Sequence, residues 1–341
     1  MYKYNILSKL VLTFLVAVVA TEFNARAAKA EDDTLVLYCG RKKSLVGPIV
    51  RQFERETGID VKVKYGSTSQ LALALLEEGK RSSADIFWSQ DAGALGALTA
   101  VGRFAVLPDR VLSTVHERYR NPEGRWVATS GRARVLAYSS KRVKVDALPE
   151  SVFDLTDAKW RGRVGWAPTN ASFRAFVTAM RNEHGDEKTL AWLLAMKRNK
   201  AQVYPKNTPI IQAIANGEID LGLPNHYYLL RFKKADSKYP VEQAFFKAGD
   251  IGNLINVAGV GMLSTSRHKS AAAHFAEFLL SPSVQQYTTS EIFEYPVTED
   301  VIVPEALPAA SELNEKAPKV DLDAIADVEG TLKLLREAEL L

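Results

Sequence analysis

The chain has 341 residues, of which 47% are hydrophobic and 25% charged, and its 44 basic and 40 acidic side chains leave a formal net charge of +4. This composition is that of a globular protein of about two domains and excludes a disordered chain. The near balance of charges argues against nucleic-acid binding. The single cysteine, Cys39, excludes an internal disulfide and any cysteine-rich zinc or iron–sulfur site.

The N-terminus has the pattern of an export signal peptide. Lys3 and Lys9 precede an apolar run at 10–20, and small residues follow it up to Ala30. The apolar run has about half the length that a bilayer-spanning helix needs, which argues against a permanent membrane anchor. We therefore expect export and cleavage after Ala30, with Ala27 as the alternative.

Apolar runs of strand length alternate with stretches of helical period in the first part of the remaining chain. Strands are expected at 34–38, 59–65 and 84–89, and helices at 45–57, 70–78 and 91–100. Gly58 and Gly79 follow two of these helices as stop signals. Alternation at this spacing predicts a parallel, doubly wound sheet.

A second α/β body follows. Strands are expected at 134–139, 163–165, 219–223 and 253–263, and helices at 170–182, 187–198, 209–216, 225–234, 269–280 and 282–290. Asn207-Thr208 caps the helix at 209–216, and Gly217 ends it. Two such bodies predict a two-lobed binding protein whose ligand lies beyond the carboxyl ends of the strands, in a cleft between the lobes.

Tyr227 and Tyr228 are adjacent in the segment Asn225-His226-Tyr227-Tyr228, directly after the strand expected at 219–223. They would lie at the carboxyl end of that strand, in the first turn of a helix. Packing in the core is the alternative for both rings, although the polar Asn225 and His226 argue against a dry environment. Tyr138, near the end of another expected strand, is a third phenol for which core packing is equally open.

Three phenols that met would make a specific metal site. A phenol has a pKa of about 10 and ionises at neutral pH only beside a strong positive centre. Fe³⁺ is such a centre, because it is small, triply charged and best satisfied by anionic oxygen. If Tyr138, Tyr227 and Tyr228 met, their phenolates would balance one ferric ion. Metal uptake would then release protons, so the affinity would fall with falling pH.

Several residues fit an anion beside such a metal. The helices that open near Asn207 and Asn225 present free N–H groups, and Ser130-Gly131, in a turn before a strand, could present two more. Arg41, after the first strand, offers a planar fork suited to carbonate or a carboxylate. A helix cap, a turn and a solvated arginine are the alternative interpretations.

Enzyme motifs are missing from the sequence. It has no phosphate-binding P-loop, no serine-nucleophile elbow and no pair of histidines at zinc spacing. Since no nucleophile or general base can be named, we do not expect an enzyme.

At these residues the chain resembles the periplasmic ferric-iron-binding proteins of ABC transporters, which are family 1 solute-binding proteins with a transferrin-like cleft. The resemblance covers nearly all of the chain after the signal peptide, in the segments TLVLYCGRKKSLVGPIV (34–50), ERETG (54–58), SADIFWS (83–89), SGRARVLAY (130–138), 160–169, YPKNTPIIQAIANGEIDLGL (204–223), NHYY (225–228) and 258–263. The tyrosine pair after an asparagine is the most specific of these. Tyr138 matches a third tyrosine that many members use.

The resemblance implies the type II periplasmic-binding-protein fold, an α/β fold of two doubly wound sheets joined by a hinge. It implies a signal peptide at 1–30, an N-terminal lobe of 31–134 plus 258–308, and a C-terminal lobe of 135–257 plus 309–341. It also implies a monomer in the periplasm that has no enzymatic activity and delivers ferric ion to a permease in the inner membrane.

The resemblance further implies that Tyr138, Tyr227 and Tyr228 are iron ligands and that carbonate or another small anion completes the site. The implied anion-binding residues are Arg41, Ser130, Gly131, Asn207 and Asn225. Where many members have a histidine ligand this chain has Lys42, and where some have a glutamate ligand it has Gln90. A metal-free protein that binds an oxyanion or an organic anion such as a phosphonate is the alternative of the same fold. A secreted enzyme is the alternative from another class.

Overall fold

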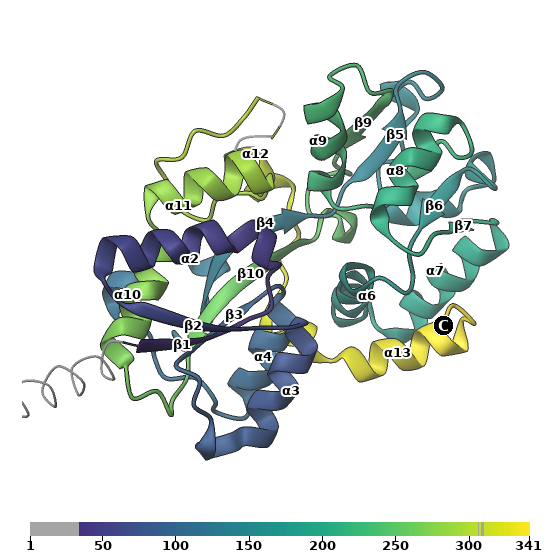
Figure 1. Ribbon diagram of the computed structural model, residues 1–341. Coiled ribbons are helices and arrows are strands. Elements are labelled where there is room, and N and C mark those ends of the chain that lie inside the picture. The colour runs from purple at the N-terminus through teal and green to yellow at the C-terminus, as the bar shows by residue number, and fades with distance from the viewer. Residues whose placement is uncertain (1–33, 306, 308–309) are drawn as a thin grey trace, which may run out of the picture.

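The computed structural model describes residues 34–305, 307 and 310–341, so the expected signal peptide lies outside the described residues. The chain forms two α/β lobes side by side, each built on a mixed sheet of five strands (Figure 1). No helix in the described part of the chain is long and apolar enough to cross a membrane.

The N-terminal lobe is built on the first sheet, in the strand order β2-β1-β3-β10-β4, with strands β1 (Thr34–Cys39), β2 (Asp60–Tyr65), β3 (Ile86–Ser89), β4 (Val127–Ala133) and β10 (Ile255–Met262). Its helices are α2 (Lys43–Thr57), α3 (Thr68–Glu78), η1 (Gly79–Arg81), α4 (Ala92–Ala100), α5 (Asp109–Leu112), η2 (Glu117–Tyr119), α10 (Lys269–Leu279), α11 (Pro282–Tyr287) and η7 (Thr288–Ile292), a π-helical turn. The later segments α12 (Ala310–Lys316) and η8 (Asp323–Ala326) also contact this lobe.

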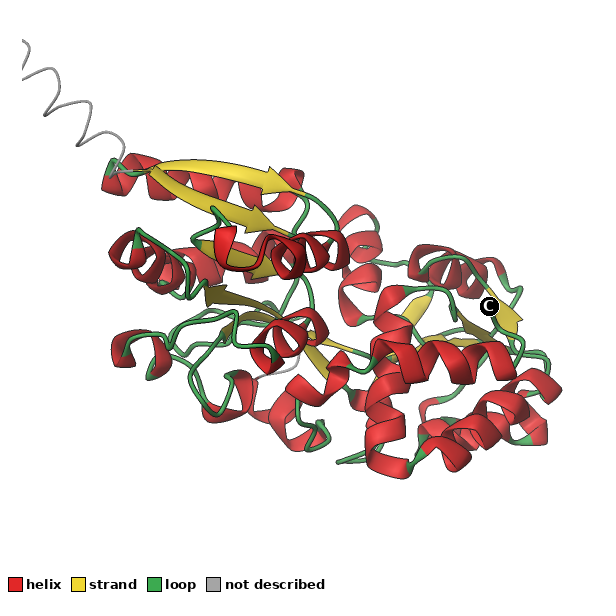
Figure 2. Cartoon of the chain, turned by 90° about the horizontal axis from the view of Figure 1, so that it is seen from below, coloured by secondary structure: helices red, strands yellow, loops and turns green. Residues whose placement is uncertain are grey.

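The C-terminal lobe is built on the second sheet, in the strand order β7-β6-β8-β5-β9, with strands β5 (Leu136–Ser139), β6 (Val164–Trp166), β7 (Gln202–Val203), β8 (Leu221–Gly222) and β9 (Val241–Ala244). Its helices are η3 (Val145–Ala147), η4 (Val152–Thr156), η5 (Ala158–Trp160), α6 (Ala171–His184), α7 (Asp186–Arg198), α8 (Asn207–Asn216), α9 (His226–Ala235), η6 (Ile251–Asn253) and α13 (Val328–Glu337). Helices of both lobes lie on either side of the strands, as the view from below shows (Figure 2).

Local sequence explains the ends of the first helices. α2 ends at Gly58, whose φ of 72° is in the left-handed region, and the Gly58 N–H donates to the carbonyl oxygen of Glu54. α3 begins with a capping box, because Ser67 and Gln70 each bond to the backbone N–H of the other. The helices expected from residues 45 and 70 are therefore confirmed, and each begins two residues earlier than predicted.

Two local predictions are wrong. Ser130 and Gly131 are not in a turn: they lie inside β4, every residue of which is buried, because β10 pairs with this strand from Ile255 to Val260. The first sheet is not wholly parallel, because β10 runs antiparallel to both β3 and β4. A Ser-Gly pair that suggests a turn is thus overridden by pairing with a strand far along the chain.

The chain passes between the sheets at Arg134-Val135, which joins β4 to β5, and again just before β10. At the first crossing Arg134 forms an isolated bridge with Asn225, and its backbone N–H donates to the carbonyl oxygen of Leu254 at 2.9 Å. The two crossing segments therefore lie side by side. The lobe boundaries inferred from the resemblance stay predictions.

The aromatic core of the C-terminal lobe positions the start of α6. The ring of Trp166, at the end of β6, packs edge-on against Phe173 of α6 and Trp192 of α7, with centroid distances of 5.6 and 6.0 Å. All three rings are buried. Because edge-to-face contacts of this kind fix ring orientation, they hold the first turn of α6 at the carboxyl end of β6.

Candidate functional site

The tyrosine pair follows β8, where three residues lead into α9. Asn225 occupies the cap position, and Tyr227 and Tyr228 lie in the first turn, as predicted. Their ring centroids are 4.6 Å apart with an interplanar angle of 34°. Asn225 Nδ2 donates to Tyr227 Oη at 3.2 Å. The Arg231 guanidinium lies 5.0 Å from the Tyr227 ring centroid and 5.8 Å from that of Tyr228, which fixes both rings from below.

Both phenols line a cleft between the lobes with a volume of about 290 Å³. The C-terminal lobe contributes Asn170, Ala171, Ser172 and Arg174 to its walls, and the N-terminal lobe contributes Ser69, Gln90, Asp91, Gly93 and Asn256. Arg132, from the end of β4, lies between the two sets. The cleft therefore has tyrosines and a helix start on one side and polar groups on the other.

Arg132 places a positive charge against the tyrosine pair. Its side chain is buried, donates to the backbone oxygen of Gln90 and bonds to Tyr227. Burial alone would lower the pKa of Arg132, but the neighbouring Tyr227, Glu294 and Asp91 more than offset this, so the pKa is raised. Arg132 Nε is buried without a hydrogen-bond partner among the described residues. The Nε–H of this guanidinium can therefore donate to a further, anionic ligand.

The start of α6 forms a second wall suited to an anion. Asn170 Oδ1 accepts from the N–H of Ser172 at 2.9 Å and so caps the helix. Asn207, at the start of α8, donates to Ser172 Oγ at 3.4 Å and bonds to the Tyr228 hydroxyl. The Oδ1 atom of Asn207 is buried and has no partner within the described segments. Side chains from the starts of α6 and α8 thus meet beside Tyr228, and a helix N-terminus favours negative charge nearby.

The hydroxyl of Tyr228 holds its proton strongly. Its pKa is raised chiefly by burial and then by the adjacent Tyr227, while Asn207 and Arg231 act in the opposite direction. A cation that displaces this proton must therefore be strongly polarising, which is a property of Fe³⁺ rather than of monovalent or large divalent ions.

Arg41 does not face this cleft. Its Nη1 and Nη2 atoms donate to the two carboxylate oxygens of Glu294 at 3.1 and 2.9 Å, and both side chains are buried. Ser130 Oγ donates to the same carboxylate, and Gly131 pairs with Tyr295 through backbone bonds in both directions. Burial would raise the pKa of Glu294, but Arg41 and Arg132 lower it, so the carboxylate is charged. The anion-binding roles of Arg41, Ser130 and Gly131 stay predictions.

Tyr138 is not among the residues that line the cleft. It lies in β5 opposite Leu221 of β8 and Glu242 of β9. Burial raises its pKa, and Glu242 raises it further. The structure thus brings together Tyr227, Tyr228, Asn207 and Asn225, whereas Tyr138 lies elsewhere. Its ligand role stays a prediction.

The sequence did not predict that Arg132, Asn170 and Ser172 line the site. Asn170 had a usable signal, because it opens an expected helix that follows an expected strand, as Asn225 does. Arg132 had no such signal, because the turn expected at Ser130-Gly131 left the direction of the Arg132 side chain undefined. Of the two departures from the resembled family, Gln90 lines the cleft and Lys42 is exposed.

His226 links segments of the backbone instead of facing the cleft. Its Nε2 lies 2.7 Å from the carbonyl oxygen of Phe293, and its Nδ1 accepts from the N–H of Ala133 at 3.2 Å. Burial lowers the pKa of His226 to about 4, so the ring is neutral at neutral pH. Within the described ranges, no three His, Cys, Asp or Glu side chains gather to hold a metal.

Comparison with known proteins gives consistent matches. Residues 81–327 match the family model described as bacterial extracellular solute-binding protein. The chain is 32% identical to the Fe(3+)-binding periplasmic protein of Serratia marcescens over 94% of each chain. It is similar to the crystal structure of iron-bound HitA from Pseudomonas aeruginosa, with a TM-score of 0.81, 33% identity, and coverage of 89% of this chain and 99% of the other. It is also similar to a Trichodesmium IdiA (FutA) protein in complex with iron and citrate, with a TM-score of 0.80, 25% identity, and coverage of 90% and 100%.

The buried Arg41–Glu294 pair generates a stability prediction. Glu294→Ala leaves the Arg41 guanidinium buried without its carboxylate, so we expect a loss of about 3–5 kcal/mol in the free energy of unfolding. Glu277→Ala is the matched control, because Glu277 accepts from Arg110 at the same 2.9 Å in a solvent-exposed pair. That change is expected to cost less than about 1 kcal/mol. Denaturant unfolding of both variants measures the difference, and equal losses would contradict the assigned role of burial.

Proposed function

We propose that this chain, which belongs to the bacterial extracellular solute-binding proteins, binds ferric ion in the cleft between its lobes and presents it to the permease of an ABC importer in the inner membrane. One observation carries the proposal: two adjacent phenols line a small interlobe cleft and face a buried arginine. The similar proteins of Serratia marcescens and Pseudomonas aeruginosa are named as Fe(3+)-binding and iron-bound, which supports the same cargo. The expected export signal and the periplasmic relative support a periplasmic location.

Tyr227 and Tyr228 are the proposed ligands from the protein. As phenolates they would supply two hard, anionic oxygens on one side of the cleft. Tyr138 is a proposed third ligand on the ground of the resemblance alone. Gln90 has a neutral amide side chain, and Lys42 is exposed. We therefore expect that neither position supplies a carboxylate or imidazole ligand to the iron.

A small anion would complete the site. Arg132, with its unpartnered Nε, and the start of α6 are the groups within this cleft that favour one. Asn207 and Asn225 would orient the phenols beside it. Arg41, Ser130 and Gly131 stay proposed anion ligands on the resemblance, and carbonate is the proposed anion.

The alternative function is metal-free binding of an oxyanion or organic anion. Arg132 and the helix starts favour such a ligand equally well, so the phenols are what distinguish the two functions. Phenolate–Fe³⁺ absorbs visible light, whereas an anion complex does not. Metal analysis and the visible spectrum of the protein purified from the periplasm therefore separate them.

The tyrosine pair is tested by removing single hydroxyls. Tyr227→Phe and Tyr228→Phe should each weaken and shift the visible band and lower the iron affinity by at least about tenfold, because each removes one charged ligand. Tyr239→Phe is the control, since this C-lobe ring stacks on Phe232 away from the cleft. Tyr138→Phe tests the third ligand in the same titration. Full colour and iron content in both Tyr227 and Tyr228 variants would refute the assignment.

Acid is expected to release the iron. Protons compete with Fe³⁺ for the phenolates, and the raised pKa of Tyr228 strengthens that competition. Retention should therefore be complete near neutral pH and fall as the pH is lowered, while the secondary structure persists. The visible band and far-ultraviolet circular dichroism, followed in one titration, measure both. A band that survives until the fold itself is lost would contradict the prediction.

The two candidate anion-binding arginines are distinguished by a bicarbonate series. A lysine cannot reproduce the two-pronged contact of a guanidinium with carbonate. If Arg132 holds the anion, Arg132→Lys should weaken iron binding by about tenfold or more at low bicarbonate and recover in part as bicarbonate is added. Arg41→Lys should then reproduce the curve of the unaltered protein. The reverse pattern would assign the anion to Arg41, as the resemblance implies.

A further inference from the structure

The C-terminal tail is attached to both lobes. In Figure 1 it runs from beside α4 of the N-terminal lobe to α13, which lies along the C-terminal lobe. We call the segment 323–327, which connects these two attachments, the tether. It is separate in sequence from both crossing segments between the sheets, so it is a further connection between the lobes.

The N-lobe attachment is centred on Asp323. Its two carboxylate oxygens accept from Asn121 Nδ2 and Trp126 Nε1, both at 2.7 Å, and the two donor residues are buried. The backbone of the tether lies directly on α4 at Gly96, where an added Cβ would come within 2.4 Å of the carbonyl oxygen of Asp323. At Gly93 the corresponding distance to the carbonyl oxygen of Ile325 is 3.0 Å. This close approach requires glycine on the helix.

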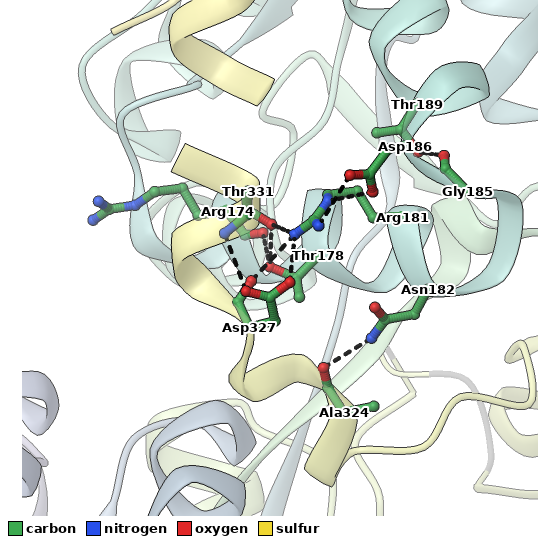
Figure 3. Close-up of polar contacts among 11 residues, drawn as sticks. Arg174, Thr178, Arg181, Asn182, Gly185, Asp186, Thr189, Ala324, Asp327 and Thr331 are labelled. Atoms are coloured by element: carbon green, nitrogen blue, oxygen red, sulfur yellow. Dashed lines mark hydrogen bonds and ion pairs between the residues drawn. The ribbon is translucent and has the colours of Figure 1, made fainter. Parts of the chain in front are cut away.

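The C-lobe attachment is centred on Asp327, and Figure 3 shows its contacts. Arg181 of α6 forms an ion pair with Asp327 at 3.0 Å, and its Nη1 also donates to Thr331 Oγ1 at 3.1 Å. Thr178 and Thr331 share a buried hydroxyl bond of 2.7 Å. Asn182 Nδ2 donates to the carbonyl oxygen of Ala324 at 2.8 Å (Figure 3). These bonds hold Asp327, and also Ala324 near the start of the tether, on the same helix whose first turn lines the cleft.

The tether is short. Only three residues separate Asp323 from Asp327, and η8 holds this stretch as a 3₁₀ turn. Four steps at a 3₁₀ rise of about 2 Å span about 8 Å, whereas the same steps fully extended span about 14 Å. Once the bond from Asn182 to Ala324 opens, Asp323 and Asp327 can therefore separate by about 6 Å at most before one of their attachments detaches.

The tether also forms part of the cleft. Ile325 of η8 and Val328, the first residue of α13, line the same cavity as Tyr227 and Tyr228. A volume of about 290 Å³ is at the small end of ligand pockets, which hold roughly 300–1,000 Å³. A larger cargo would require the lobes to move apart at the edge that the tether spans.

We propose that the tether limits the opening of the cleft and thereby restricts its cargo to ferric ion with a small anion, excluding bulky ferric chelates. The proposal rests on the iron-binding function proposed above. In this proposal Asp323 and Asp327 are positioning residues, which do not contact the cargo. They affect it only by limiting how far the lobes separate.

Gly96→Ala tests most directly whether the tether limits the separation of the lobes. The new methyl group meets the Asp323 backbone, so the N-lobe attachment must shift, while alanine itself favours the α4 helix. Gly47→Ala is the matched control in another N-lobe helix, where the methyl group meets only the flexible side chains of Arg51 and Lys43. Spin labels at Lys62→Cys and Lys141→Cys, one exposed position in each lobe, report the lobe separation, because Cys39 is buried.

In the metal-free protein we expect Gly96→Ala to broaden the label distances and to extend them by more than the roughly 6 Å that the intact tether allows, because its N-lobe attachment has shifted. Gly47→Ala should leave them unchanged. Asp323→Ala, with exposed Glu329→Ala as its control, gives a second test should Gly96→Ala fold poorly. Distances in Gly96→Ala and Asp323→Ala that match those of the unaltered protein would overturn the proposal.

The cargo restriction is measured on iron-loaded protein. Desferrioxamine, a bulky hydroxamate chelator, should remove iron about tenfold faster from Gly96→Ala than from Gly47→Ala, because the more open state is more populated. Citrate, a small chelator, should show a smaller difference. Equal rates with desferrioxamine would overturn the restriction. If the unaltered protein takes up no iron, the proposed function fails, whereas the distance measurement still decides whether the tether limits opening.

Discussion

Arg134 lies at the crossing between the two sheets, and its buried guanidinium donates to the carbonyl oxygen of Leu223 at 2.6 Å and to that of Ser172 at 2.8 Å. Leu223 follows β8 and leads into the tyrosine pair, and Ser172 lies in the first turn of α6. The same guanidinium packs over the rings of Phe173 and Phe176. The Arg134 side chain therefore bonds both to the segment that presents the phenols and to the helix start that favours an anion. Arg134 itself lies in the segment that connects the two lobes.

This arrangement explains why part of the site could be predicted and part could not. The tyrosine pair and Asn225 follow local rules, because they lie where an expected strand gives way to an expected helix, and Asn207 lies where an expected helix opens after a loop. Arg41 satisfies the same rule, yet its guanidinium is paired with Glu294, 253 residues later in the chain. A contact at that separation leaves no local pattern. Which arginine faces the cleft is decided by tertiary pairing rather than by residue type.

The fold shows the same division between local and distant causes. Helices followed by a glycine stop were predicted to within two residues, as α2 and α3 show, although only α3 of the two has a side-chain cap. The strand at 127–133 was missed because its Ser-Gly pair suggests a turn, and only its pairing with β10 makes it a strand. The tail lay beyond sequence reasoning altogether, since its attachment depends on glycines in α4 that have no meaning until Asp323 is placed on them.

The distribution of charge in the cleft is consistent with a cargo of ferric ion plus anion. In the proposed site, the phenolates of Tyr227 and Tyr228 would leave one positive charge of Fe³⁺ unbalanced, and a doubly charged carbonate would then give the cluster one excess negative charge. Arg132, whose raised pKa keeps it protonated, supplies the opposite charge at the required place. Glu294 lies behind Arg132 and is itself balanced by Arg41. The buried charges thus alternate from Arg41 through Glu294 to Arg132, whose guanidinium lies against Tyr227 of the cleft.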